Sequence, residues 1–230
     1  MELGNLVDGF TTAESEDCLT LNIWTRGDSK NKPIMVWIFG GGFVCGSSSE
    51  PTYNASNFVS AHDVVIVTLN YRLNVFGFMN LANVDSSLED SGYLGLKDQL
   101  AALKWIKENI GEFGGNPDNI TVFGESAGSI STFFLTIAPT AKNLFQKVIP
   151  QSGAVVFYKN PEDSAQVTES FMKFCGDSVA FTAVGIFGCF SRARPVVYFQ
   201  RPVSRTESKS NACKCNSSVM GGICGDWQPE

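Results

Sequence analysis

A serine between two glycines is the feature of this sequence best suited to chemistry. Gly124, Ser126 and Gly128 form a Gly-x-Ser-x-Gly pattern that follows an apolar run, 120–123, and precedes a stretch that can be helical. The pattern fits a sharp strand-to-helix turn, in which side chains two residues before and after the serine would collide. Such a turn exposes the Ser126 hydroxyl, and the N–H of Ala127 faces the same point. We therefore predict a serine nucleophile with an anion-binding N–H beside it.

A run of three glycines, Gly40, Gly41 and Gly42, follows the apolar segment 34–39. Consecutive glycines have no side chains to pack, and they allow a backbone path in which N–H groups turn towards a bound group. The alternative interpretation is an ordinary loop that ends a strand. Together with the serine pattern, the run favours a site that stabilises negative charge.

The segments around these residues predict an α/β fold. Apolar segments at 19–24, 34–39, 64–69, 120–123 and 148–150 are typical of strands, and those at 95–110, 127–137 and 162–174 are typical of helices. Segment 73–93 is expected to be a long ordered loop. Fully apolar strands that alternate with helices predict a mainly parallel sheet covered on both faces. In such a sheet ligands bind at the carboxyl ends of the strands, where the glycine run and Ser126 fall.

Two of these elements carry expectations about burial. Segment 19–24 alternates apolar and polar residues, which predicts a strand half exposed to water. Helix 95–110 is expected to have a buried apolar stripe and a solvent-facing charged side. The stripe comprises Leu96, Leu100, Leu103, Trp105, Ile106 and Ile110, and the charged side comprises Lys97, Asp98, Lys104, Lys107 and Glu108.

Composition narrows the classes of function. The chain has 230 residues, of which 43% are hydrophobic, and a net charge of −6 without a basic stripe, so we expect no nucleic-acid partner. There is no run of 18 or more apolar residues, and the first residues lack the pattern of a signal peptide. The expected location is cytoplasmic for the chain as written, or secreted if a preceding segment is missing.

The carboxyl-terminal part differs in composition. Four of the seven cysteines follow residue 180, and after about residue 182 the sequence predicts no regular element. We therefore predict a domain at 1–180, and a divergent, poorly ordered tail at 181–230. Metal binding by Cys213, Cys215 and Cys224 is an alternative for the tail, but these cysteines lack a fourth ligand and the usual spacing. We predict no metal and no cofactor.

Seven short motifs occur in one order along the chain. They are SEDCL at 15–19, WIFGGGF at 37–43, NYR at 70–72, GLKDQ at 95–99, FGGNP at 113–117, GESAG at 124–128 and QSG at 151–153. In this order they resemble the type-B carboxylesterase and cholinesterase family of α/β-hydrolases, over roughly residues 10–175. The resemblance implies the α/β-hydrolase fold and hydrolysis of carboxylic esters, which are small-molecule substrates, through an acyl-enzyme.

The resemblance also implies residue roles. Ser126 corresponds to the acylated nucleophile, and Gly41, Gly42 and Ala127 correspond to the three N–H donors of the oxyanion hole. Glu125 corresponds to an acidic residue beside the serine, with a supporting role. One oxyanion donor is typically worth about 3 kcal/mol of the activation barrier.

The departures from the family concern the remaining catalytic groups. Family members supply an acid and then a histidine after the serine, whereas the only histidine here is His62, which we expect at a surface or loop end. Asp163 and Asp177 follow Ser126 but match no family position. Cys18 corresponds to a half-cystine whose partner precedes it in the family, and no earlier cysteine is present.

We interpret the chain as the amino-terminal half of an esterase, with a fold truncated at both ends and an inactive or impaired site. The alternative is a non-catalytic cholinesterase-like adhesion or scaffold domain, although such relatives usually replace the serine. A sheet without its outer strands exposes apolar edges, so self-association through those edges is also expected.

Overall fold

Strand pairing organises the structure, a computed structural model that describes residues 15, 17–27, 29–153, 160–175, 196–200 and 213–215. These residues form a sheet with the order β5-β4-β2-β3-β1-β6-β7. The strands are β1 (Thr20–Trp24), β2 (Lys32–Ile38), β3 (Val65–Leu69), β4 (Gly115–Glu125), β5 (Lys147–Gln151), β6 (Val196–Gln200) and β7 (Cys213–Cys215). β2 pairs in parallel with both β3 and β4, and β4 in parallel with β5. β1 is antiparallel to β3 and parallel to β6, and β6 is antiparallel to β7. The predicted, mainly parallel sheet is confirmed.

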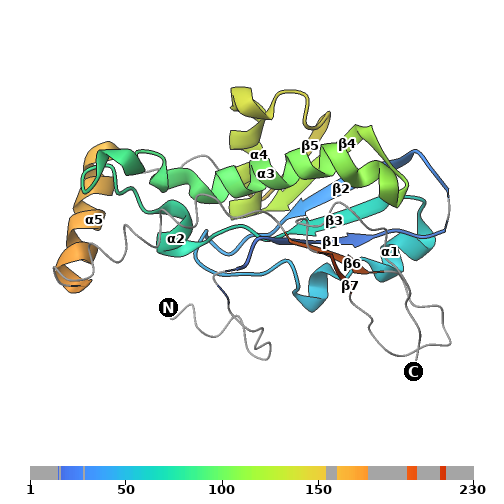
Figure 1. Cartoon of the computed structure of the whole chain (residues 1–230), viewed down its shortest axis with the longest axis horizontal. Coiled ribbons are helices and arrows are strands. Elements are labelled where there is room, and N and C mark those ends of the chain that lie inside the picture. The colour runs from blue at the N-terminus through green and yellow to red at the C-terminus, as the bar shows by residue number, and fades with distance from the viewer. Residues whose placement is uncertain are drawn as a thin grey trace.

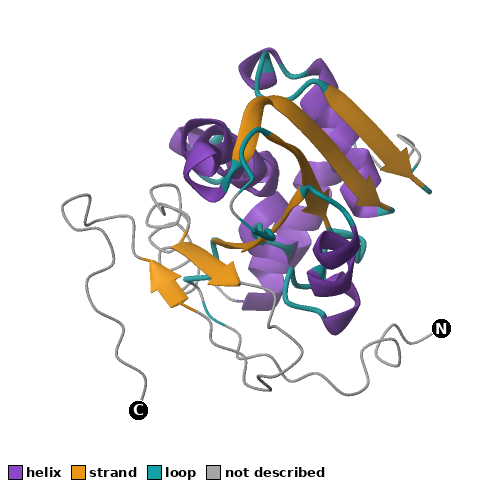
Figure 2. Cartoon of the chain, turned by 90° about the vertical axis from the view of Figure 1, so that its right-hand side faces the viewer, coloured by secondary structure: helices purple, strands orange, loops and turns teal. Residues whose placement is uncertain are grey.

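Helices lie on both faces of this sheet (Figures 1 and 2). The described helices are α1 (Ser56–Ala61), α2 (Asn74–Phe78), α3 (Leu94–Asn109), α4 (Ala127–Ile137) and α5 (Pro161–Cys175), of which α5 lies beyond the end of the sheet, at the left of Figure 1. Short 3-10 helices span Pro51–Tyr53, Ser86–Leu88, Ser91–Tyr93, Ile110–Phe113 and Pro139–Ala141. α3 and α4 cover one face, and α1 packs on the other. None of the helices in the described segments is both long and apolar enough to cross a membrane.

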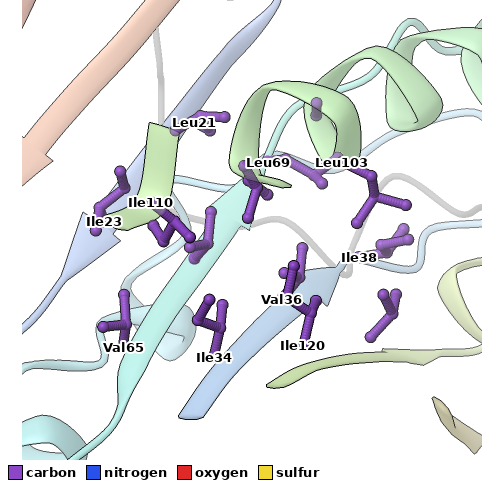
Figure 3. Close-up of a cluster of buried hydrophobic side chains, with 14 of the residues drawn as sticks. Leu21, Ile23, Ile34, Val36, Ile38, Val65, Leu69, Leu103, Ile110 and Ile120 are labelled. Atoms are coloured by element: carbon purple, nitrogen blue, oxygen red, sulfur yellow. The ribbon is translucent and has the colours of Figure 1, made fainter. Parts of the chain in front are cut away.

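The main core lies between the sheet and α3 (Figure 3). Alternate residues of the central strands point to this side, as the two-residue period of a strand requires. They include Ile34, Val36 and Ile38 of β2 and Val65, Val67 and Leu69 of β3, all fully buried beneath Leu103 and Ile106 of α3. The opposite face is covered more sparsely, by Val59 of α1 and its neighbours against Ile66 and Trp24.

Two burial expectations are wrong. β1 is not half exposed, because Asn22 is buried and its side-chain amide donates to Thr68 Oγ1 and Ser48 Oγ at 3.1 and 3.2 Å. On α3, Asp98 does not face solvent: it is buried, and Arg72 forms an ion pair with it. In both cases a polar side chain tolerates burial because a polar partner from another segment satisfies it.

Other differences concern element boundaries. The predicted loop 73–93 contains α2 and two 3-10 helices, and β4 begins at Gly115 rather than at residue 120. β6 and β7 lie in the region for which no regular element was expected, so that expectation is wrong for these two segments. β6 extends the sheet beside β1, because pairing with an existing edge can order a short apolar run that has no periodic signal of its own. The apolar run 187–190 lies outside the described residues, and the division at 180 stays a prediction.

Candidate active site

Strand register brings the glycine run and the serine together. β2 and β4 are parallel neighbours in which Ile38 is paired with Gly124. Gly40 and Ser126 each come two residues after this pair, at the carboxyl ends of the strands. A Cβ built on Gly40 would lie 3.3 Å from the Cβ of Ser126. Two motifs separated by more than 80 residues of sequence therefore meet at one point.

Ser126 occupies a strained turn between β4 and α4. Its φ is 52° and its ψ is −117°, a conformation that a non-glycine residue rarely adopts. Its N–H donates to the carbonyl of Gln151 at 2.9 Å, and its own carbonyl accepts from Ile130 N–H at 3.0 Å. The turn is thus held by β5 on one side and by the first turn of α4 on the other.

The two flanking glycines are required by close backbone contacts. A Cβ on Gly124 would lie 2.6 Å from the carbonyl carbon of Gly128, and a Cβ on Gly128 would lie 2.0 Å from the carbonyl oxygen of Ile38. Real Cβ atoms do not approach backbone so closely. The collision predicted from the Gly-x-Ser-x-Gly spacing therefore corresponds to contacts present in the structure.

Of the residues expected to act as anion donors, Ala127 follows the serine directly, and Gly41 and Gly42 follow Gly40, the glycine that lies close to Ser126. Ala127 is the first residue of α4, so its N–H has no acceptor within the helix. Gly41 and Gly42 are exposed and have φ values of 96° and 64°, whereas Gly40 is buried against Glu125 and Ser126. The carbonyl of Gly41 accepts from the N–H groups of Val44 and Cys45, at 3.0 and 3.2 Å. The loop therefore turns sharply directly after Gly40.

His62 lies near the amino end of β3, whereas Ser126 lies at the carboxyl ends of the strands. It is the exposed C-terminal cap of α1, just before β3, and its ring packs on Phe58 with 4.7 Å between ring centroids. Val65 of β3 and Ile120 of β4 both pair with Ile34 of β2, so the three residues lie at the same level along their strands. His62 comes before Val65, whereas β4 continues for five residues beyond Ile120 to Glu125. That length alone is about 16 Å at 3.3 Å per residue. His62 is a surface histidine, as expected, and it is far from hydrogen-bond reach of Ser126.

Of the carboxylates singled out in the sequence, Glu125 and Asp163 are described by the structure, and both are exposed. Glu125 is exposed next to the serine, and its Oε2 would lie 2.9 Å from a Cβ on Gly40. Asp163 is exposed in the first turn of α5, where its N–H bonds to Asn160 Oδ1 at 2.7 Å. Asp177 lies outside the described residues. In the described part of the chain no group of His, Cys, Asp and Glu could hold a metal ion. Cys224 and the side chains of Cys213 and Cys215 are not among the parts described.

Comparison with known proteins decides the family. Residues 2–195 match the model of the carboxylesterase family. The chain belongs to the carboxylesterase family. It is 49% identical over 164 residues to the para-nitrobenzyl esterase of Bacillus subtilis, which covers 71% of this chain and 33% of that protein. It is 47% identical over 145 residues to carboxylesterase 1D of Rattus norvegicus, covering 62% and 25% of the two chains.

Solved structures of carboxylesterases share the fold. The carboxylesterase EST55 of Geobacillus stearothermophilus matches with a TM-score of 0.66 and 47% identity, over 70% of this chain and 35% of that one. An esterase of Clostridium hathewayi, described as able to hydrolyse aliphatic aromatic polyesters, matches with a TM-score of 0.70 and 37% identity, over 79% and 38%. The fold is the α/β-hydrolase fold. This carboxylesterase-family chain spans a third or less of the length of the curated relatives named above.

Sequence reasoning missed the polar contacts that fix the segment after β3. Asp98 accepts hydrogen bonds from Arg72 Nε at 2.7 Å and from Arg72 Nη2 at 2.6 Å. Burial raises the pKa of Asp98, while the hydrogen bonds and charge of Arg72 oppose that rise. A helical spacing of four places Asp98 on one face with the buried residues Leu94 and Ala102, and this signal could have identified it.

Two tyrosines near the site keep their protons at neutral pH. Burial, aided by the charge of Glu50, raises the pKa of Tyr53 to about 12. Burial likewise raises the pKa of Tyr71, whose hydroxyl donates to the carbonyl of Phe39 at 2.9 Å. Tyr71 therefore acts as a hydrogen-bond donor to the backbone beside the glycine run.

The half-buried thiol of Cys18 is free, and burial raises its pKa as well.

Proposed function

We propose that Ser126 is the acylated nucleophile of a carboxylic ester hydrolase, with the N–H groups of Gly41, Gly42 and Ala127 as its oxyanion hole. The observation that carries this proposal is the contact between Gly40 and Ser126 at the carboxyl edge of the sheet. A loop of glycines whose N–H groups have no side chain to shield them stands next to a serine on a strained turn. Membership of the carboxylesterase family supports the same chemistry.

The reaction is a two-step acyl transfer. The Ser126 oxygen attacks the ester carbonyl carbon while a base takes its proton, and the oxyanion of the tetrahedral intermediate accepts hydrogen bonds from the three N–H groups. Collapse of the intermediate expels the alcohol, which receives that proton, and leaves an acyl-serine. Water then attacks the acyl-serine by the same route and releases the carboxylic acid. Glu125 supports the site electrostatically and carries no proton in this scheme.

The one histidine in the sequence is not placed to act as the base. His62 lies near the amino end of β3, whereas Ser126 lies at the carboxyl ends of the strands. Loss of the base in a serine hydrolase costs on the order of 10⁶-fold in turnover and leaves about 10³ to 10⁴-fold over water. We propose that the chain, expressed as it stands, is nearly inactive towards a simple aryl ester.

The test is covalent labelling with chemical rescue. The folded chain is treated with a fluorophosphonate, with and without added imidazole, and the modified peptide is identified by mass spectrometry against a Ser126→Ala control. We expect slow labelling at Ser126 that imidazole accelerates, because imidazole can replace the missing base. A folded chain that stays unlabelled at Ser126 even in imidazole would contradict the proposal and favour the alternative, a non-catalytic scaffold domain. Rapid turnover of an aryl ester without imidazole, lost in Ser126→Ala, would instead contradict the proposed inactivity.

A further inference from the structure

The backbone on the amino side of the glycine loop (Gly40–Gly42) is held by a side chain from the next segment. The carbonyl of Phe39 accepts the Tyr71 hydroxyl at 2.9 Å. The rings of Phe39 and Tyr71 also stack, with centroids 4.5 Å apart, and the two residues are 1% and 2% exposed. A buried carbonyl has few alternative partners, so this hydrogen bond fixes where the loop begins.

The carboxyl side of the loop is held by the same segment. The carbonyl of Phe43 accepts the N–H of Asn74 at 2.7 Å, and the Phe43 ring packs on Phe78 with centroids 4.7 Å apart. Phe43 and Asn74 have φ values of 63° and 53°. A bulky aromatic residue is an outlier in this region and persists only where its surroundings over-determine it. Segment 71–78 therefore contacts the loop at both of its ends.

The Phe39 carbonyl also borders the helix that carries the serine at its start. A Cβ on Gly128 would lie 3.0 Å from the Phe39 oxygen, so this carbonyl is close to the first turn of α4 as well as hydrogen-bonded to the Tyr71 hydroxyl. The same carbonyl therefore borders both the start of the glycine loop and the helix that follows Ser126. The Tyr71 hydroxyl is thus connected to the geometry of the serine through one backbone group.

Segment 71–78 is itself fixed to the core. Arg72 follows Tyr71 directly, and its guanidinium makes two hydrogen bonds to the buried Asp98 of α3. The N–H of Arg72 donates to the same carboxylate at 3.0 Å. Since α3 packs across the main core, Tyr71 is held in one position relative to the sheet.

We propose that Tyr71 is a positioning residue whose hydroxyl keeps the Gly41 and Gly42 N–H groups in place for reaction at Ser126. This inference rests on the proposed function, because it assumes that those N–H groups bind the oxyanion. Tyr71 touches neither substrate nor the reacting atoms, and it acts only through the Phe39 carbonyl.

The experiment compares Tyr71→Phe with Tyr93→Phe in the full chain. Tyr93 is 43% exposed, and its hydroxyl bonds to Asp90 at the surface. The rate of fluorophosphonate labelling at Ser126 is measured in imidazole as a function of probe concentration. We expect Tyr71→Phe to lower the maximal rate about tenfold, with the half-saturating concentration unchanged, because one buried hydrogen bond is lost. Tyr93→Phe should label like the wild type, and a Tyr71→Phe variant that also does so would overturn the proposal.

Hydrogen exchange separates this inference from the proposed function. In Tyr71→Phe, exchange in segment 40–46 should rise while exchange in β3 stays unchanged. If the folded wild type is not labelled at all, the proposed function fails, and this exchange comparison decides the positioning role alone. Unchanged exchange in segment 40–46 would then refute it.

A second pair of variants decides the matter if Tyr71→Phe does not fold. Asn74→Gly tolerates the φ of 53° and keeps the N–H that bonds to Phe43, whereas Asn74→Ala strains it. Slower labelling or faster exchange in the alanine variant, restored in the glycine variant, supports a loop held by segment 71–78. Equal behaviour of the two variants contradicts it.

Discussion

The carbonyl oxygen of Ile38 lies so close to Gly128 that a Cβ on Gly128 would be only 2.0 Å from it. This approach seats the first turn of α4 directly on the end of β2, next to the glycine loop. We predict that Gly128→Ala lowers the free energy of unfolding by about 3 kcal/mol or more, since the backbone of β2 or α4 must move to accept a methyl group. Urea unfolding followed by circular dichroism measures the change.

Gly111→Ala is the matched control for this prediction. Gly111 lies in the 3-10 helix after α3, and a Cβ there has no atom within 4 Å. The added methyl group restricts the unfolded chain without a clash, so we expect no loss of stability. Similar urea midpoints for the two variants would show that the contact between Gly128 and Ile38 is not tight in solution.

The Arg72 and Asp98 pair leads to a second prediction. Both side chains are about 5% exposed, and removal of one partner leaves the other charge buried and unpaired. We expect Asp98→Ala to cost about 3 to 5 kcal/mol of unfolding free energy. The double variant Arg72→Met/Asp98→Leu should be clearly more stable than Asp98→Ala, because it buries no charge. A double variant less stable than the single one would contradict this account.

The sequence predicted the parts of the fold that repeat a pattern. The central strands β2 and β3 and the helix α3 follow from apolar runs and a helical period, and their bounds agree within one or two residues. The Gly-x-Ser-x-Gly spacing likewise predicts the turn at Ser126, because the close contacts of Gly124 and Gly128 exclude side chains. Local sterics and periodicity suffice for these features.

Contacts between distant polar residues were not predictable in this way. Asp98 looked like a solvent residue because charge favours water, and only the presence of Arg72, 26 positions earlier, makes its burial acceptable. The hydrogen bond of Tyr71 to the Phe39 carbonyl depends on the neighbouring ends of β2 and β3, which no single segment encodes. The strand β6 depends on pairing with β1 rather than on its own pattern.

From the pKa values of Tyr71, which is buried, and Tyr53, which is half-buried, we predict a loss of stability in alkali. An unfolded tyrosine ionises near pH 10, whereas the pKa of Tyr53 is raised to about 12 and that of Tyr71 is also raised. Above pH 10 the unfolded state therefore binds fewer protons than the folded state, and the free energy of unfolding falls as pH rises. Below pH 9 these two groups should contribute no pH dependence.

Urea midpoints between pH 8 and pH 11.5 measure this effect, and absorbance of tyrosinate near 295 nm follows the ionisation directly. Tyr71→Phe removes one of the two raised groups, so its midpoint should fall less steeply above pH 10 than that of the wild type. Identical slopes for the two proteins would mean that Tyr71 ionises in the folded state as it does in water.

The free edge of β5 leads to the last prediction, which concerns self-association. Within the described residues β5 pairs only with β4, and Ile149 at its centre is 44% exposed. Pro150 lacks an N–H, which limits pairing along this edge, but the apolar side chains remain open to a second copy of the chain. We propose that the chain self-associates at micromolar concentrations through this edge. Sedimentation velocity over a range of concentrations should show dissociation in Ile149→Lys, because a charge would be buried against an apolar surface. Ile137→Lys is the control, since Ile137 is 61% exposed on α4 rather than on the strand, and it should associate like the wild type. Association that both variants weaken equally would point to a general hydrophobic surface and away from the edge of β5.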